Sequence, residues 1–265
     1  MKDEIIAALP GDHPWQRLIW WFDSIDSTNT RARELAKQGA PEGTILLADT
    51  QTGGRGRMGR SFHSPAGTGI YMSVILRPEC APGELMHLTC AVAVAICDAV
   101  EAATGLRPGI KWTNDLVFGK RKLGGILTEL GLGTDGRVDY AIVGIGVNCC
   151  QREEDFPADI RAIAGSLAMA TGTAVDRPRA AAAMICSLRE MRMRLLSDKD
   201  ALLAQYRRDC VTLGKSISLV RGDEVRHGKA LDIDSEGALV VEFSPGIAET
   251  VNSGEVSIRG MYGYV

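Results

Sequence analysis

The 265-residue chain changes its pattern near residue 212, and this change restricts the folds that it can adopt. Before that point, apolar residues at helical spacing alternate with short apolar runs of the kind found in buried strands. After it, only short β-rich runs occur, separated by turn residues such as Arg221-Gly222-Asp223 and Pro245-Gly246. Strands this short and this regularly interrupted are typical of a small barrel. We therefore predict a mixed α/β domain over residues 1–211 and an all-β domain over residues 212–265.

Spacing and turn chemistry predict the elements of both domains. A short helix is expected over Thr28–Gln38, because Asp26-Ser27 supplies capping side chains and Gly39 ends the pattern. Glu84–Thr104 keeps its apolar residues in helical register until a glycine, which predicts the main core helix. Strands are expected at 44–49, 69–76, 110–118, 122–130 and 137–147, further helices at 178–196 and 200–210, and the β-rich runs at 216–220, 224–232, 238–243 and 248–258.

Composition and charge exclude several classes of protein. Thirty Lys and Arg residues stand against 33 Asp and Glu, and 45% of residues are hydrophobic, which is ordinary for a folded soluble chain. With a net charge of −3, no global positive field attracts phosphate backbones, so we expect no nucleic-acid partner. The longest apolar run, Cys90–Cys97, is far shorter than the roughly 18 residues that a membrane span needs. The N-terminal segment lacks the features of a secretory signal.

Seven cysteines, an odd number without a CxxC pair, indicate reduced thiols and a cytoplasmic protein. A redox role for the adjacent Cys149 and Cys150 is the less favoured alternative, because neighbours in a strand point to opposite faces.

A loop rich in glycine and arginine, Gln51–Arg60, is the most distinctive segment of the chain. Its Gly54-x-Gly56-x-x-Gly59 spacing resembles a dinucleotide fingerprint, but no helix follows it, so a Rossmann site is not expected. Residues 50–78 contain four arginines and no acid. Glycines let backbone N–H groups and guanidinium groups close around an anion, which favours an anion site over the alternative of a solvated basic turn.

Three further segments carry polar residues or glycines. Lys111-Trp112-Thr113-Asn114-Asp115 places a compact cation before a turn, and the last two residues offer oxygens for Mg²⁺, although an Asn-Asp pair is more often an ordinary turn. Lys120-Arg121-Lys122 adds charge nearby. In Gly144-Ile-Gly146-Val-Asn148, glycines within a strand mark close approach of a ligand or a neighbouring strand. Asn148 is placed either to contact a polar ligand edge or to cap a turn.

Taken together, these segments resemble the biotin–protein ligases, the enzymes that attach biotin to carboxylases. The resemblance rests on Asp26–Asn29, Gln51–Arg60, Ser64-Pro65 with Gly67, Lys111–Asp115, Arg121–Leu127 and Gly144–Asn148, in the family order. It implies a catalytic domain like that of class II aminoacyl-tRNA synthetases, with a mixed sheet and flanking helices, and a small C-terminal SH3-like barrel. Only some 25 residues precede Asp26, too few for the winged-helix DNA-binding domain of many relatives. The monofunctional form is therefore implied, with no DNA partner and with either a monomer or a homodimer allowed.

The family chemistry implies a role for each matching residue. ATP, escorted by Mg²⁺, activates biotin as biotinyl-5′-AMP, and biotin then passes to a lysine of the biotin carboxyl carrier domain of a carboxylase. The implied catalytic residues are Lys111, Arg57 and Arg55; the biotin-binding residues are Ser27, Thr28, Asn29, Gln51, Arg55, Gly56, Arg57 and Lys111; the ATP- or adenylate-binding residues are Arg57, Arg60, Phe62, Asn114, Lys122 and Asn148. Phe62 stands where relatives commonly carry Trp, and it offers less surface for stacking on adenine. No dedicated metal cluster is expected, and Mg²⁺ is expected near Asn114 and Asp115.

Alternatives exist for both the motif and the function. Ser27–Asn29 could simply cap the following helix, and both roles are compatible. A lipoate or octanoate ligase shares the type of catalytic domain but needs a long apolar tunnel in place of polar groups for the ureido ring. A transcriptional repressor that senses the adenylate is disfavoured by the net charge of −3 and by the missing recognition helix.

Overall fold

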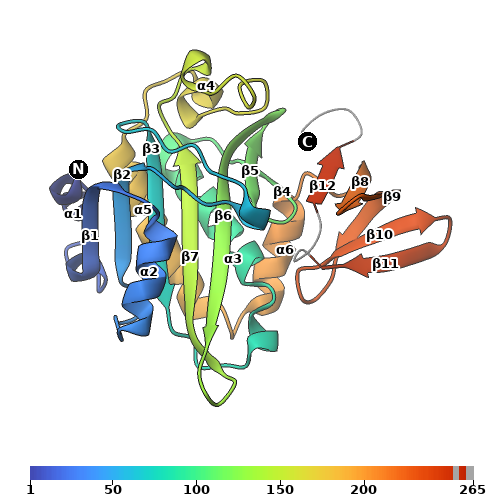
Figure 1. The fold of residues 1–265 in the computed structure, drawn as a ribbon, viewed down its shortest axis with the longest axis horizontal. Coiled ribbons are helices and arrows are strands. Elements are labelled where there is room, and N and C mark those ends of the chain that lie inside the picture. Colours follow the sequence, from blue (N-terminus) through green and yellow to red (C-terminus); the bar gives the residue numbers. More distant parts are fainter. Residues whose placement is uncertain (253–256, 261–265) are drawn as a thin grey trace.

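The computed structural model describes residues 1–252 and the backbone of residues 257–260. A seven-stranded sheet with helices on both faces forms the larger part of the molecule, and a five-stranded sheet lies at one end (Figure 1). This is the mixed α/β arrangement followed by an all-β segment that the sequence predicts.

The central sheet has the strand order β1-β2-β3-β7-β6-β5-β4. Only β1 and β2 are parallel, and the other neighbours pair in antiparallel fashion. Its strands are β1 (Ile19–Ile25), β2 (Ile45–Gln51), β3 (Gly69–Leu76), β4 (Gly109–Lys111), β5 (Asp115–Phe118), β6 (Arg121–Leu132) and β7 (Val138–Asn148). All eight residues of β3 are buried, as expected for a central strand covered on both faces.

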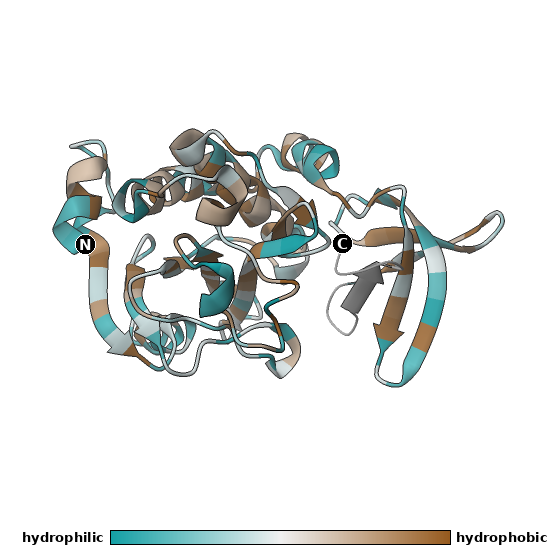
Figure 2. Ribbon diagram, turned by 90° about the horizontal axis from the view of Figure 1, so that it is seen from above, coloured by the Kyte–Doolittle hydropathy of each residue, from teal (hydrophilic) through white to brown (hydrophobic). Residues whose placement is uncertain are grey.

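Helices cover the two faces of this sheet unequally, as Figure 2 shows from above. Long helices pack on one face and enclose the main core, while α2 alone packs on the other, against β2, β3 and β7. The helices are α1 (Lys2–Ala8), α2 (Thr28–Lys37), α3 (Leu88–Thr104), α4 (Leu167–Thr171), α5 (Arg177–Arg194) and α6 (Lys199–Asp209). Short 3-10 turns occupy 16–18, 57–59, 82–85 and 153–155.

The apolar segment Pro82–Thr104 is the central helix of the core. By length and composition alone it is apolar enough to cross a membrane, but 72% of its apolar window is buried inside the molecule. It packs against α5, α6 and β6. The predicted single helix from Glu84 is in fact a 3-10 turn, Pro82–Leu85, followed by α3, because Glu84 turns back to accept the N–H of Ala81 at 2.8 Å. Gly105, at φ 74°, ends α3 as predicted.

Helix α2 begins and ends where the sequence predicts. The hydroxyl of Ser27 caps it by accepting the N–H of Thr30 at 3.5 Å, and Gly39 follows its last turn at φ 86°. Its apolar stripe of Ala32, Leu35 and Ala36 packs on the sheet. This packing fixes the helix N-terminus, and with it Thr28 and Asn29, over the ends of β2 and β3.

Other boundaries differ from the predictions. The expected strand 110–118 is two short strands, β4 and β5, that pair with each other around a turn at 112–114. Three elements were not predicted: α1, α4 and the edge strand β1. Strand β1 mixes buried, intermediate and exposed residues without a regular period, so no two-residue alternation marks it in the sequence.

The C-terminal sheet is antiparallel with the order β11-β10-β9-β8-β12. Its strands are β8 (Ser216–Arg221), β9 (Glu224–Ile233), β10 (Leu239–Ser244), β11 (Ile247–Val251) and β12 (Ser257–Gly260). The predicted run 248–258 falls on parts of β11 and β12, and its residues 253–256 lie outside the described residues. The arrangement is that of the SH3-like domain implied by the resemblance.

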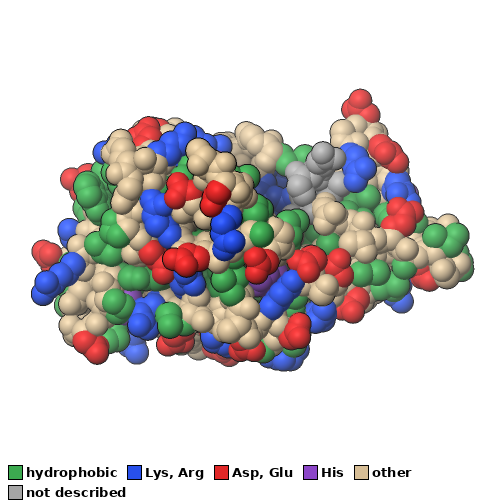
Figure 3. Space-filling model, turned by 90° about the horizontal axis from the view of Figure 1, so that it is seen from below, with side chains coloured by type: hydrophobic (Ala, Val, Ile, Leu, Met, Phe, Trp, Pro, Cys, Tyr) green, Lys and Arg blue, Asp and Glu red, His purple; other side chains and the backbone are tan. Residues whose placement is uncertain are grey.

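Hydrogen bonds and an ion pair join α6 and the turn between β4 and β5 to the end of β9 and the turn that follows it. The indole N–H of Trp112 donates to the carbonyl of Gly237 at 3.0 Å, and Arg207 Nε donates to the carbonyl of Ile233 at 2.9 Å. Lys199 and Glu236 form an ion pair at 2.7 Å. Acidic and basic side chains are interspersed over the face seen from below (Figure 3).

We expect Arg107→Gln to lower the free energy of unfolding by about 1–3 kcal/mol. Arg107 follows α3 and pairs with Asp98 and Glu101 of that helix and, at 2.5 Å, with Asp209 of α6. Because the Asp209 side chain is only 11% exposed, the substitution leaves a nearly buried carboxylate without its partner. Urea unfolding measures the change. The exposed pair Arg194–Asp198 supplies the control Arg194→Gln, with an expected change below about 0.5 kcal/mol; equal losses in the two variants would contradict the argument.

Candidate functional site

A cavity of about 630 Å³ opens where the ends of several strands meet the glycine–arginine loop. It is lined by most of the residues that the sequence singled out: Ser27, Thr28, Asn29, Gln51, Arg55, Gly56, Arg57, Arg60, Phe62, Lys111, Asn114, Asp115 and Lys122. These come from the N-terminus of α2, the end of β2, the loop, β4 and its turn, and β5 and β6. The loop cations and Lys111 therefore face one shared space.

Glycines of β7 form the floor of the cavity. A Cβ atom on Gly144 would overlap the side-chain amide of Asn29, and one on Gly146 would lie 2.5 Å from the ring of Phe62. Both contacts are impossible for a larger residue without displacing a side chain that lines the cavity. The close approach predicted from these glycines is confirmed, and it is made by side chains from α2 and from the loop.

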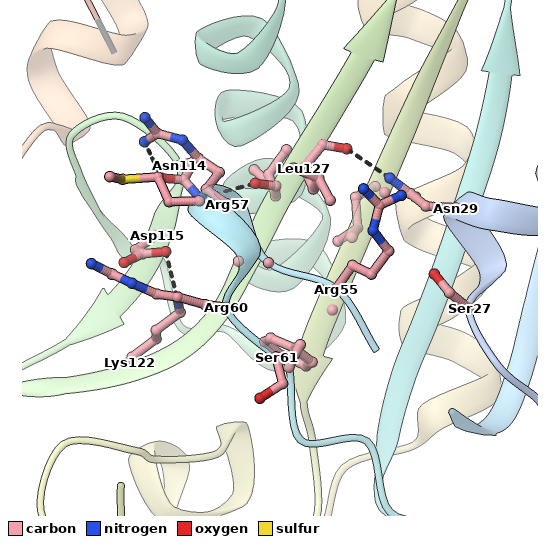
Figure 4. Close-up of a pocket in the computed structure, with 18 of the residues that line it drawn as sticks. Ser27, Asn29, Arg55, Arg57, Arg60, Ser61, Asn114, Asp115, Lys122 and Leu127 are labelled. Carbon is pink, nitrogen blue, oxygen red and sulfur yellow. Dashed lines mark hydrogen bonds and ion pairs between the residues drawn. The ribbon is translucent and has the colours of Figure 1, made fainter. Parts of the chain in front are cut away.

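A hydrogen-bonded network fixes the polar end of the cavity at the N-terminus of α2. Gln51 Oε1 accepts from the backbone N–H of Thr28 at 2.9 Å and from its hydroxyl at 3.0 Å, and Gln51 Nε2 donates to Ser64 at 3.0 Å. Asn29 Nδ2 donates to the carbonyl of Leu127 at 3.3 Å (Figure 4). Ser27 both caps α2 and lines the cavity, so the two roles considered for it are compatible.

Ser73 belongs to this network and was missed in the sequence. Its side chain is fully buried on β3, and its hydroxyl donates to Asn29 Oδ1 at 2.6 Å while lying 2.8 Å from Thr28 Oγ1. A single serine in an apolar run, Gly69–Leu76, was the available signal. Since a buried polar group requires a partner, that serine indicated a polar neighbour on the element that packs against this face of the sheet, which is α2.

The glycine–arginine loop is closed by two backbone hydrogen bonds. Phe62 N–H donates to the carbonyl of Gly54 at 2.9 Å, and Gly56 N–H donates to that of Arg60 at 2.7 Å. A Cβ on Gly54 would lie 2.5 Å from the carbonyl oxygen of Phe62, so this closure requires glycine. Met58 has a φ of 56°, a left-handed conformation that costs energy in a residue other than glycine.

This loop directs its arginines to opposite ends of the cavity (Figure 4). Arg55 extends toward Asn29 and pairs with Glu129 at 3.2 Å. Arg57 extends toward the turn between β4 and β5, where it donates to Asn114 Oδ1 at 3.0 Å. The sequence grouped these arginines together, and the structure separates them.

Positive charge gathers at the end that holds Arg57. Arg57, Arg60, Lys111 and Lys122 line the cavity, and Asp115 is the carboxylate among the described lining residues. Asp115 and Lys122 form an ion pair at 2.5 Å. Lys111 is buried, with only 7% of its surface exposed. Burial lowers the pKa of the Arg57 guanidinium, and Asp115 opposes that shift. Four cations against one carboxylate make this end suited to anionic groups.

The chemistry of the lining fits a magnesium ion that arrives with a nucleotide. Among the described residues, no group of three His, Cys, Asp or Glu side chains is placed to hold a metal. Asn114 uses its amide to donate to Ile126 at 2.9 Å and to accept from Arg57. Mg²⁺ commonly binds through one or two carboxylates together with substrate phosphates, and Asp115 supplies one carboxylate.

Asn148 lies outside this cavity, so the structure does not place it with the other predicted residues. It is 6% exposed, donates to the carbonyl of Gly165 at 2.9 Å and accepts from Gln151 at 3.3 Å. These bonds hold the segment after β7 against the sheet. Of the two roles considered for Asn148, this geometry supports the structural one.

Comparison with known proteins gives the same assignment over both parts of the chain. Residues 21–148 match the model of the biotin/lipoate A/B protein ligase family, and residues 212–259 match the biotin protein ligase C-terminal domain. The chain is 38% identical over 247 residues to the bifunctional ligase/repressor BirA of Bacillus spizizenii, which covers 93% of this chain and 75% of that protein. It is 31% identical over 265 residues to the biotin–[acetyl-CoA-carboxylase] ligase of Mycobacterium tuberculosis, covering 97% of this chain and 93% of that one.

Among solved structures, the biotin protein ligase from Aquifex aeolicus in complex with biotin and ATP is similar, with a TM-score of 0.78 and 30% identity, covering 91% of this chain and 98% of that chain. Fold and cavity thus define a protein of the biotin/lipoate protein ligase class. Within this class, the chain belongs to the biotin protein ligase family.

We expect Ser73→Ala to lower the free energy of unfolding by about 1–2 kcal/mol, because Asn29 Oδ1 loses its buried donor. Ser24→Ala is the matched control, since Ser24 is exposed on β1 and should give a change near zero. Thermal unfolding of the two variants against the parent measures the difference. A Ser73→Ala protein as stable as the parent would show that this hydroxyl does not support the network.

Proposed function

We propose that the protein is a biotin–protein ligase whose cavity holds biotin at the α2 end and the phosphates of ATP at the Arg57 end. ATP activates biotin to biotinyl-5′-AMP, and biotin then passes to a lysine of the biotin carboxyl carrier domain of a carboxylase. The observation that carries the proposal is the polarity of the cavity: uncharged hydrogen-bonding groups, together with Arg55 paired to Glu129, gather at the α2 end, and four cations gather at the other end. Both ligands named for the similar Aquifex aeolicus structure, biotin and ATP, suit this division.

The α2 end complements a ureido ring, which has two N–H donors and one acceptor oxygen. Among the bonds of the described residues, Asn29 uses both of its N–H groups within the protein, so its oxygen is the atom that can receive a ring N–H. The side-chain oxygen of Gln51 accepts from Thr28, and one N–H of its amide donates to Ser64. The second N–H remains available to donate to a ligand. The hydroxyl of Ser27 donates or accepts. This set rejects a ligand without the ureido group, such as lipoate, because the protein groups would stay unpaired.

The cationic end suits the first chemical step. An oxygen of the biotin carboxylate attacks the α-phosphorus of ATP, a phosphorus–oxygen bond forms there, and pyrophosphate leaves with the electrons of the bond that breaks. Two anions must meet, so catalysis consists mainly of charge neutralisation and alignment. We assign Lys111 and Arg57 to the carboxylate and the α-phosphate, and Arg60 and Lys122 to the nucleotide. Phe62, whose ring packs on Gly146, also lines the cavity, and we assign it to stacking on adenine.

The catalytic site and the C-terminal sheet suggest a division of the chain at residues 1–211 and 212–265, supported by the C-terminal family match that starts at residue 212. The seven free cysteines support action in the cytoplasm, where thiols remain reduced. The acceptor of biotin is proposed by analogy with the relatives named as ligases of acetyl-CoA carboxylase.

Incubation with biotin, Mg·ATP and a carrier domain should add one biotinyl group to that domain, detected by mass spectrometry. We expect Lys111→Ala to reduce biotin-dependent ATP–pyrophosphate exchange at least about 100-fold, since it removes a cation at the reacting groups. Lys120→Ala is the control, because Lys120 is exposed at the turn between β5 and β6 and should exchange normally. Full exchange in Lys111→Ala would refute its role, and lipoate-dependent exchange in the parent would refute the choice of substrate.

A methyl group on the cavity floor tests the binding end separately. Gly144→Ala should weaken biotin binding about 10–100-fold, because the new Cβ displaces the amide of Asn29 and misaligns a buried hydrogen bond. A Cβ on Gly83 meets nothing within 4 Å, so Gly83→Ala is the control and should bind like the parent. Isothermal titration with biotin gives both dissociation constants. Unchanged affinity in Gly144→Ala would place biotin elsewhere.

A further inference from the structure

Glu129 lies at the edge of the cavity and joins three segments that the sequence left unconnected. It projects from β6, two residues beyond Leu127, and its side chain is 21% exposed. Oε2 accepts from Asn29 Nδ2 at 3.0 Å. Oε1 accepts from Arg55 at 3.2 Å and from Arg33 of α2 at 3.4 Å. One carboxylate therefore holds the start of α2 and the glycine–arginine loop together.

The polarity of this arrangement decides which way the amide of Asn29 points. A carboxylate only accepts hydrogen bonds, so the NH₂ group of Asn29 must face Glu129. Ser73 donates to Oδ1 from the opposite side at 2.6 Å. Glu129 and Ser73 thus clamp the amide between an acceptor and a donor, and its oxygen is the atom left for a ligand N–H.

Arg55 is held by the same carboxylate. Arg33 and Arg55 carry two positive charges within reach of one Glu129 oxygen, so loss of the negative charge would leave the two guanidinium groups to repel each other without a shared partner. The pairing keeps Arg55 at the α2 end of the cavity while Arg57 lies at the other end.

We propose that Glu129 is a positioning residue for biotin recognition: it orients the Asn29 amide so that Oδ1 accepts a ring N–H, and it anchors the first arginine of the loop beside the ring. This inference rests on the proposed function and deepens it, because it names the residue that sets the donor–acceptor pattern of the ureido site. Glu129 acts through Asn29 and Arg55 and has no contact with the reacting phosphate.

An amide in place of the carboxylate cannot satisfy all three donors. If the oxygen of a glutamine at position 129 faces the arginines, its NH₂ group opposes that of Asn29, and the Asn29 amide is driven to rotate and present N–H groups to the cavity. If the oxygen faces Asn29, the NH₂ group opposes the arginines and Arg55 is released. Either orientation weakens the binding of the ring, and the contacts at the Arg57 end of the cavity stay as they are.

The experiment measures the KM for biotin and for ATP separately, in biotin-dependent pyrophosphate exchange. Glu129→Gln should raise the KM for biotin at least about tenfold, the loss expected for a hydrogen bond to a charged group. The KM for ATP and kcat at saturating biotin should stay within about twofold of the parent values. Glu34→Gln is the matched control: it removes an exposed α2 carboxylate that pairs with Arg31 at 2.8 Å, and it should leave both constants unchanged.

The outcomes are distinct. An unchanged KM for biotin, or equal rises in both KM values together with a lower Tm, would overturn the role of Glu129. If Glu129→Gln does not fold, Glu129→Asp keeps the charge but shortens the side chain by one methylene, and it should still raise the KM for biotin alone; an unchanged value would overturn the proposal. Absence of biotin-dependent exchange in the parent protein would refute the proposed function itself.

Discussion

The concentration of positive charge in one cavity is the main constraint on this domain, because the rest of the domain must hold these cations close together. Arg57, Arg60, Lys111 and Lys122 repel one another, and Asp115 balances only part of that charge. Burying cations costs free energy unless anions or hydrogen-bond acceptors compensate them. The scaffold must therefore hold the cations in place before a substrate arrives. An anionic ligand would relieve their repulsion, so this arrangement favours anionic groups.

The sheet supplies the rigidity that this arrangement needs. Strands β3 and β7 are buried between helices, and the glycines of β7 let Asn29 and Phe62 lie directly on its surface. The turn between β4 and β5 is held from the opposite side, since Trp112 donates to Gly237 of the C-terminal sheet and Tyr206 donates to the carbonyl of Thr113 at 3.1 Å. Lys111 and Asn114 flank these anchors. The C-terminal part of the chain thus stabilises the turn between β4 and β5, and none of its described residues lines the cavity.

Local patterns predicted most of the fold and most of the lining. Helix α2, the core helix, the hairpin of β5 and β6 and the C-terminal strands follow from periodicity, caps and turn residues, which act over a few positions. The missed edge strand β1 has no regular alternation, and the division of 110–118 into β4 and β5 depends on pairing with β6. Within the site, Ser73 and Glu129 went unnoticed because the role of a lone polar residue in a strand depends on partners from other elements, here Asn29 of α2.

The sequence by itself determined which chemical groups are present: a glycine-rich loop that can approach a ligand, a surplus of arginine without nearby acids, and a capped helix with short polar side chains. Only the tertiary structure decided how those groups are divided. It placed Arg55 beside Glu129 at the α2 end of the cavity and Arg57 beside Asn114 at the cationic end, and it placed Asn148 in hydrogen bonds with Gly165 and Gln151. The reason is distance along the chain. Capping and periodicity act between close neighbours, whereas Arg55 meets Glu129 and Arg57 meets Asn114 only after the sheet has assembled.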